Sequence, residues 1–292
     1  MRNSNAKSGY VIEKYSNMGS AYTCRRLVEE AKAQDMDLRI IGIHDTVITR
    51  GGLLSSGMAL EKRDFVINRY KWGKIKDEIN RLAVRSYNPL NAFNIYINKL
   101  EQMRRLHSDA FVLPEYMAGT GAAPFAALAA QLGLPFVAKG LESSMGEQIL
   151  LIEKEADFSG LVKAYGEQKE WLFEEFITNS VGRDIRFFSI RGHAVAGMVR
   201  TSKGDFRANV ALGADVEPYD ITPGMEIIAA DIYAQTGLDF LGIDLLFGPD
   251  RPFFCEINVM PGIEGMETAT GVNIAKLMID TIRSDFLVDK LG

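Results

Sequence analysis

The residues best suited to chemistry lie in two apolar stretches, LGIDLLF and FFCEINVMPG, which a turn-rich segment, GPDRP, separates. This pattern predicts a β-hairpin, and a pairing of Phe247 with Phe253 sets its register. In that register Asp244 lies directly opposite Glu256, with about 5 Å between their Cβ atoms. Asn258 points to the same face as Glu256, because side chains alternate along a strand. Three oxygen-donor side chains are therefore expected to converge.

These oxygen donors need a positive partner, because an unpaired carboxylate is costly to bury between apolar strands. Oxygen ligands without His or Cys favour a hard cation such as Mg²⁺, which usually completes its octahedron with substrate phosphates. The alternative is that Asp244 and Glu256 pair with structural Lys or Arg side chains. Strict alternation predicts that Cys255, which lies beside Glu256, faces the opposite side of the sheet and belongs to the core.

Lys139 is a second candidate, because it ends the apolar run LPFVA and precedes the loop GLESSMGEQI, which contains Ser144 and Gly146. Backbone N–H groups and a lysine can together hold a polyphosphate. The loop lacks the GxxxxGK[ST] spacing of a P-loop, and the chain has no helix-opening GxGxxG. By itself the loop therefore does not identify a nucleotide site, and a solvated turn with an exposed lysine is the alternative.

Arginines follow in the segment GRDIRFFSIRGHAVAGMVR, where two short strands are expected to join around Arg191 and Gly192. Arginine on a sheet face suits phosphate or carboxylate, because the guanidinium group can donate twice to either. A two-residue loop places Arg186 and Arg200 on opposite faces, whereas a three-residue loop places them together. The sequence leaves this register open, and ion pairs on an exposed sheet, with Asp184 among them, are the structural alternative.

Three units are predicted to position these residues. Residues 1–97 alternate short apolar runs with helical periodicity, which is typical of an open α/β lobe. Residues 98–175 form a smaller central unit. In residues 176–292 the strands come in adjacent pairs, which indicates antiparallel pairing. Strands are expected at 10–12, 38–43, 65–67, 110–113, 135–139 and 171–177, and helices at 20–34, 98–106, 124–132, 225–236 and 272–284.

Composition narrows the class of protein. The 292 residues are 47% hydrophobic and 24% charged, which is typical of a globular chain with more than one core. A net charge of -5 argues against sequence-independent binding of nucleic acid. The only cysteines, Cys24 and Cys255, form no disulfide framework or thiolate zinc motif, and Cys24 lies on a buried helix stripe. Without an apolar signal segment or membrane span, a cytoplasmic protein is expected.

The ordered motifs FEEFI, GRDIRFF, GDFRAN, GIDLLF and CEINVMPGIEGMETATGVNIA resemble those of the ATP-grasp superfamily, and specifically the RimK-type amino-acid ligases. The resemblance implies an α/β ATP-grasp fold with an N-terminal open α/β lobe, a small central lobe and a C-terminal antiparallel lobe. It implies an enzyme that uses ATP and Mg²⁺, with Mn²⁺ as a substitute, to join a carboxylate to an amine through an acyl-phosphate. By family analogy, the amine is that of glutamate or another amino acid.

Position by position, the resemblance also implies roles for individual residues. Arg200 lies near the transferred phosphate and Arg186 is its neighbour. Asp244, Glu256 and Asn258 match the magnesium ligands. The resemblance implies that Lys99 and Lys139 reach the nucleotide, that Glu175 and Phe176 hold the adenine, and that Asp184 contacts the ribose. It also implies that Arg207, Ala208 and Asn209 form a nucleotide-binding stretch and that Ser144 and Gly146 belong to the phosphate loop.

The phosphate loop departs from the commoner GSxGxG form of the family. Ser143 and Gln148 stand at two of its places, as in a SxGxQ subset, and Glu142 adds a negative charge. An alternative function follows, a nucleotide-binding regulatory or scaffold protein whose loop no longer closes. The sequence leaves open whether the carboxylate acceptor is a small molecule or a peptide, and whether the chain forms a homo-oligomer.

Overall fold

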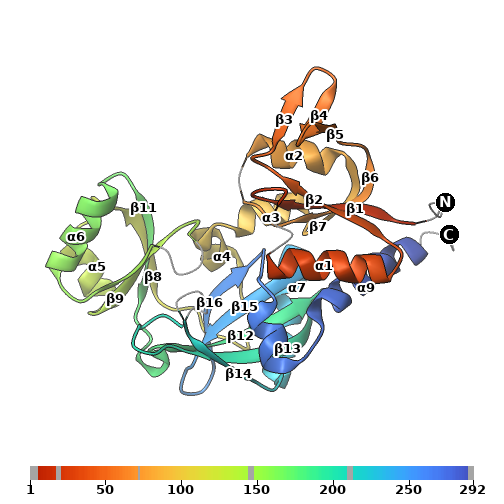
Figure 1. Ribbon diagram of the computed structural model, residues 1–292. Helices are drawn as coiled ribbons and strands as arrows, with labels where there is room; N and C mark the ends of the chain where they lie inside the picture. The colour runs from red at the N-terminus through yellow and green to blue at the C-terminus, as the bar shows by residue number, and fades with distance from the viewer. Residues whose placement is uncertain (1–5, 18–20, 72, 144–147, 209–212, 289–292) are drawn as a thin grey trace.

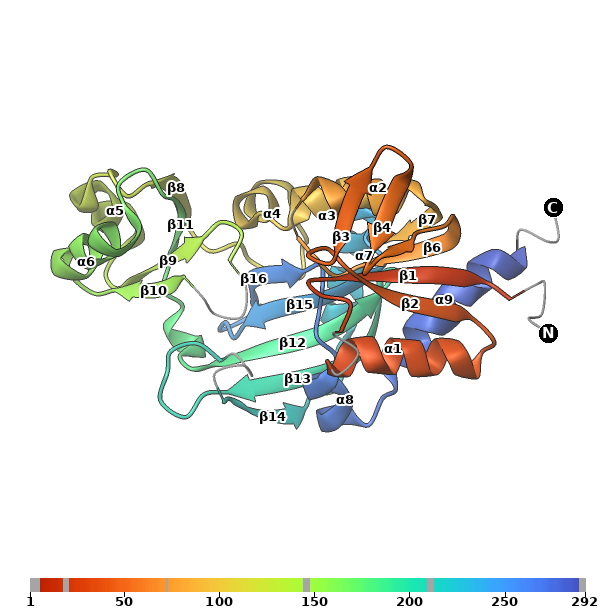
Figure 2. The same ribbon diagram turned by 45° about the horizontal axis from the view of Figure 1, so that its top comes forward.

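The computed structural model describes residues 6–17, 21–71, 73–143, 148–208 and 213–288. Three larger sheets and one small sheet carry the fold (Figure 1). Figure 2 shows the central sheet at one end of the molecule, apart from the other two large sheets. No helix in these ranges is long and apolar enough to cross a membrane.

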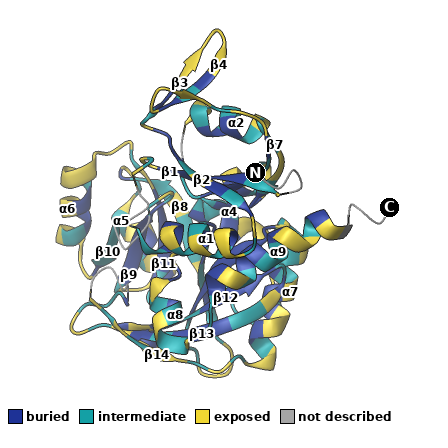
Figure 3. Ribbon diagram, turned by 45° about the vertical axis from the view of Figure 1, so that its right-hand side comes forward, coloured by how far each residue is buried: buried dark blue, intermediate teal, exposed yellow. Residues whose placement is uncertain are grey.

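The N-terminal sheet is parallel, with the strand order β2-β1-β6-β7. Its inner strands are nearly continuous apolar runs because both faces are covered, and Val11 and Phe65 are fully buried. A small antiparallel sheet, β3-β4-β5, projects from it and is largely exposed (Figure 3). The bounds are β1 (Ser8–Glu13), α1 (Tyr22–Ala33), β2 (Asp37–Gly42), β3 (Thr46–Thr49), β4 (Gly52–Ser55), β5 (Met58–Ala59), β6 (Arg63–Asn68), α2 (Lys74–Arg81), β7 (Ala83–Tyr87) and α3 (Leu90–Tyr96).

The central sheet is antiparallel, with the order β10-β9-β11-β8. Two helices, α5 and α6, cover one of its faces, where Leu128 and Phe158 pack against Phe173. Helix α4 leads into this unit from the N-terminal sheet (Figure 1). The bounds are α4 (Lys99–Arg105), β8 (Tyr116–Thr120), α5 (Phe125–Leu132), β9 (Phe136–Gly140), β10 (Ile149–Ile152), α6 (Glu155–Tyr165) and β11 (Glu170–Glu175).

The C-terminal sheet has the order β14-β13-β12-β15-β16, and all its pairs are antiparallel. Helix α7 packs on one face through Ile228 and Ile232. The other face shares a core with the N-terminal sheet, α1 and α9, so these two sheets form one packed body. The bounds are β12 (Arg183–Ile190), β13 (His193–Thr201), β14 (Asp215–Pro218), α7 (Pro223–Thr236), β15 (Phe240–Leu246), β16 (Phe253–Asn258), α8 (Glu264–Thr270) and α9 (Ile274–Val288).

The expected strand at residues 110–113 is wrong. Val112 makes only an isolated bridge to Phe253, accepting a hydrogen bond from Phe254 N and donating one to Pro252 O. The apolar residues there cover the outer edge of β16 instead of forming a strand of a sheet. The predicted burial of Cys24 is confirmed, and burial raises the pKa of its thiol to about 12.

Candidate active site

Strands β15 and β16 bring the two predicted metal-binding carboxylates together. Asp244 and Glu256 are direct partners across this hairpin, as the sequence predicts. The predicted pairing of Phe247 with Phe253 is wrong, because Leu246 takes that place. The two results are compatible because a β-bulge inserts one extra residue into β16 between them.

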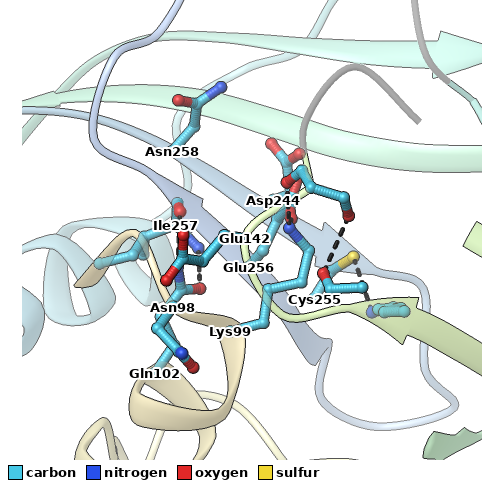
Figure 4. Close-up of polar contacts among 12 residues, drawn as sticks. Asn98, Lys99, Gln102, Glu142, Asp244, Cys255, Glu256, Ile257 and Asn258 are labelled. Carbon is cyan, nitrogen blue, oxygen red and sulfur yellow. Dashed lines mark hydrogen bonds and ion pairs between the residues drawn. The ribbon is translucent and has the colours of Figure 1, made fainter. Parts of the chain in front are cut away.

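The extra residue is Cys255, and its predicted place in the core on the far side of the sheet is wrong. Its Sγ lies 3.8 Å from Lys139 Nζ, and the residue lines the same pocket as Glu256 (Figure 4). Strict alternation of faces fails across a bulge, so two consecutive side chains reach one side. Burial raises the pKa of the Cys255 thiol to about 12.

A second bulge decides which arginines face the site. Arg191 and Gly192 form a two-residue loop in which both have positive φ, 48° and 82°. A register shift next to Phe188 then adds one residue to β13. Arg186 and Arg200 consequently share a face, although the loop has only two residues. The two arginines can therefore act on one ligand, and the bulge, not a longer loop, brings them to the same face.

Four charged side chains form a network on this face, in which Asp184, Arg200 and Asp244 are buried and Arg186 is partly buried. The guanidinium of Arg186 donates two hydrogen bonds to the Asp244 carboxylate. Arg200 donates to both carboxylate oxygens of Asp184 at 2.6 Å and to Asp244 Oδ2 at 2.9 Å. Burial alone would raise the pKa of Asp244, but the two arginines hold it at about 2. For Asp184, burial outweighs Arg200 and raises its pKa. The alternative of ion pairs on an exposed sheet is wrong, because the exposed fraction of Arg200 is 2%.

Helix α4 supplies the lysine that faces the second carboxylate. Asn98 caps this helix, its Oδ1 accepting hydrogen bonds from the N–H groups of Leu100 and Glu101. Lys99 Nζ lies 2.9 Å from Glu256 Oε2 and donates to the backbone carbonyl of Ser143. Burial acts to raise the pKa of Glu256, but Lys99 and Lys139 together outweigh it and the net shift is downward. Both metal-site candidates are thus charge-balanced by cations.

Lys139 is buried in β9, so the alternative of an exposed lysine on a solvated turn is wrong. Its Nζ lies 2.6 Å from an oxygen of Glu174 on β11. Burial acts to lower the pKa of Lys139, but Cys255 and Glu174 outweigh it and the pKa is raised.

Glu174 is a residue that sequence reasoning missed. Its exposed fraction is 2%, and its Oε1 has no hydrogen-bond partner among the described residues. Four consecutive residues of β11, from Trp171 to Glu174, are buried, so alternation could not separate Glu174 from Glu175. The available signal was Lys139, a charge within a neighbouring apolar strand that requires a counter-charge.

These elements enclose one pocket between the central and C-terminal sheets. Charged groups and apolar side chains such as Val137, Phe176 and Phe206 line it together. Arg207 is held at its rim by hydrogen bonds to Asp205. The predicted site residues that line the pocket are Lys139, Glu175, Phe176, Asp184, Arg200, Arg207, Ala208, Asp244 and Glu256.

The other predicted residues lie beside this pocket or outside the described ranges. Lys99 and Arg186 are joined to it by their ion pairs with the two carboxylates. Asn258 lies two residues beyond Glu256 on β16, and its Oδ1 accepts a hydrogen bond from Met260 N at 3.0 Å. Ser144, Gly146 and Asn209 lie outside the described residues.

The donor set limits the kind of metal that could bind. In the described part of the chain, no group of three or more His, Cys, Asp or Glu residues is placed to hold a metal ion. Two carboxylates and one amide oxygen instead suit a hard divalent cation that takes its remaining ligands from phosphates and water.

Curated relatives match most of the chain. A protein of Thioalkalivibrio sulfidiphilus named "Probable alpha-L-glutamate ligase" is 28% identical over 279 residues, which cover 90% of this chain and 92% of that protein. A protein of Methanococcoides burtonii with the same name is 28% identical over 284 residues, covering 92% of this chain and 94% of its own.

Solved structures share the fold. The ATP-grasp ligase PsnB complexed with minimal precursor superposes with a TM-score of 0.70 at 16% identity, covering 96% of this chain and 99% of that one. D-alanine–D-alanine ligase from Bacillus anthracis complexed with ATP gives a TM-score of 0.68 at 14% identity, covering 98% and 100%. These structures establish the expected ATP-grasp fold.

The family model described as the RimK-like ATP-grasp domain matches residues 118–282, more than half of the chain. The match includes the pocket's strands β9, β11, β12, β15 and β16. The chain therefore belongs to the RimK-like ATP-grasp family, and it is a ligase that uses ATP and a divalent metal ion to join a carboxylate to an amine.

Proposed function

We propose that this ligase adds glutamate or another amino acid to a carboxylate acceptor, through an acyl-phosphate intermediate. The observation that carries the proposal is the opposed pair Asp244 and Glu256, which line one pocket and are ion-paired with Arg186, Arg200 and Lys99. The names of the curated relatives favour glutamate as the amine. The structure of PsnB complexed with the precursor peptide PsnA2 favours a peptide among the possible acceptors.

The pocket offers ATP both apolar and charged groups. Its apolar walls fit an adenine ring beside Glu175 and Phe176. Glu174 Oε1, which has no hydrogen-bond partner among the residues that the structure describes, would accept a hydrogen bond from the exocyclic amine. Asp184 would contact the ribose. The phosphates would lie by Lys99 and Lys139, and the remaining nucleotide contacts fall to Ser144, Gly146, Arg207, Ala208 and Asn209.

Asp244, Glu256 and Asn258 would hold Mg²⁺, or Mn²⁺ in its place. Their chemistry fits, since Mg²⁺ is commonly bound by one or two carboxylates together with substrate phosphates. The cations that now balance these carboxylates are the groups that a triphosphate requires. When bound, Mg²⁺ would neutralise charge on the phosphate oxygens.

In the first step, the acceptor carboxylate attacks the γ-phosphorus of ATP and ADP leaves. Arg200, with Arg186 beside it, offsets the negative charge that develops on the transferred phosphoryl group. In the second step, the amine of the amino acid attacks the acyl carbon and phosphate leaves. Positioning and electrostatics supply the catalysis, so the site needs cations and no protein nucleophile.

The test is ADP release by the purified protein with ATP and Mg²⁺, screened over amino acids and carboxylate acceptors. We expect release that requires both substrates and is lost in Glu256→Gln. Glu217→Gln, the same change at an exposed position of the same sheet, is the matched control and should keep activity. Nucleotide binding without turnover across the whole screen would contradict the proposal and favour a binding-only protein.

A further inference from the structure

Strand β16 is the outer strand of the C-terminal sheet, and within the described part of the chain no strand pairs along its other edge. Near its start, Val112 pairs with this edge through hydrogen bonds at Pro252 and Phe254. Near its end, a side chain takes over this role. Gln102 Oε1 accepts a hydrogen bond from Ile257 N at 2.8 Å, and Gln102 Nε2 donates one to Ile257 O at 3.0 Å.

The carboxamide of Gln102 therefore bonds to the edge as the backbone of another strand would. Its second amide hydrogen goes to the carbonyl of Tyr96 at 2.6 Å, and its exposed fraction is 3%. These bonds bear on the site because Ile257 lies between Glu256 and Asn258. Between the two points where the edge is covered lies the bulge that turns Cys255 and Glu256 toward the pocket.

Gln102 also lies on the helix that carries Lys99. The two residues are three apart on α4, so their side chains project from neighbouring positions on one helix face. Figure 4 shows Gln102 beside Ile257 and Lys99 reaching toward Glu256. The start of the helix is also bonded to the segment after β9, because Lys99 N donates a hydrogen bond to the carbonyl of Leu141.

We propose that Gln102 is a positioning residue, which fixes strand β16 against helix α4 and thereby sets Glu256 at the metal site opposite Lys99. The inference rests on the proposed role of Glu256 in holding Mg²⁺. Partners that orient metal ligands typically change metal affinity or activity by about 10- to 100-fold when they are removed. Gln102 acts on the ligand through its two hydrogen bonds to the backbone of Ile257.

The test uses Gln102→Met, which keeps the length of the side chain and removes all three hydrogen bonds. Gln235 on helix α7 provides a matched control. Its side chain likewise accepts a hydrogen bond from the backbone N–H of His107 and donates one to the carbonyl of the same residue. We expect Gln102→Met and Gln235→Met both to lower the melting temperature. Only Gln102→Met should raise the Mg²⁺ concentration that half-saturates tight ADP binding in calorimetry, by about 10-fold or more.

A purely structural role for Gln102 would lower the melting temperature and leave the Mg²⁺ titration as in the wild type, which would overturn the inference. If Gln102→Met does not fold, Gln102→Asn gives the same test, because its amide is one methylene too short for Ile257. A wild-type protein whose ADP binding does not respond to Mg²⁺ would instead contradict the metal site itself. The two failures are therefore distinguishable.

Discussion

At the scale of single residues, the site is a set of buried charges that compensate one another. Asp244 is 1% exposed and balances both Arg186 and Arg200, so its charge is needed for folding as well as for the metal. Each arginine loses much of its hydration in this position, and its hydrogen bonds to the Asp244 carboxylate replace the lost bonds to water.

Asp244→Asn should therefore abolish ADP release and also destabilise the protein, by about 3 kcal/mol at pH 7, because it leaves buried guanidinium groups short of a counter-charge. Urea unfolding measures the second effect. Asp215→Asn removes an exposed partner of Lys203 in the same sheet and should cost less than about 1 kcal/mol. Equal stabilities of the two variants would show that the Asp244 network contributes no more to folding than an exposed ion pair.

At the scale of elements, two bulges decide which side chains reach the pocket. The sequence predicts both hairpins, the opposition of Asp244 and Glu256, and a helix at residues 98–106, where the structure has α4. It could not predict that Cys255 turns inward or that Arg186 joins Arg200 across a two-residue loop. A bulge adds a residue without a distinct residue pattern, and one added residue reverses every later side chain.

The start of α4 gives a prediction at this scale. Asn98→Ala removes the N-cap and should cost about 1 kcal/mol of stability. It should also weaken ADP binding several-fold, because Lys99 is the first residue of the helix. Thr222 caps α7 through a hydrogen bond from Met225 N, away from the pocket. Thr222→Ala should show a similar loss of stability with unchanged ADP affinity. If Thr222→Ala weakened ADP binding as much as Asn98→Ala, the proposed role of α4 in placing Lys99 would be contradicted.

At the scale of the whole molecule, ATP is proposed to bind between two sheets, one of which is packed against the N-terminal sheet. We propose lobe boundaries of 1–97, 98–175 and 176–292, each containing one of the three larger sheets. Asp285 joins three parts of this body, since from α9 it contacts Arg191 at the β12–β13 turn and Tyr87 on β7.

This junction predicts a pH dependence of stability. Burial acts to raise the pKa of Asp285, but hydrogen bonds from Arg191 and Tyr87 outweigh it, and the folded-state pKa lies below the ordinary value of about 3.9. The stabilisation is therefore complete above about pH 4 and is lost as the pH falls through the folded pKa. Asp285→Asn should cost about 1.5–3 kcal/mol at pH 7, and progressively less as the pH falls below about 4. Urea unfolding across this range checks it, and an equal cost throughout would contradict it.

The proposed mechanism depends on an acyl-phosphate intermediate, and transfer of an oxygen atom from the acceptor carboxylate to phosphate tests that intermediate most directly. An acceptor found in the ADP-release screen would be labelled with ¹⁸O in its carboxylate and turned over with ATP and the amino acid. Because the carboxylate oxygen that attacks phosphorus leaves with it, the account predicts one ¹⁸O in each inorganic phosphate released, detected by ³¹P NMR. Amide product formed with unlabelled phosphate would contradict it.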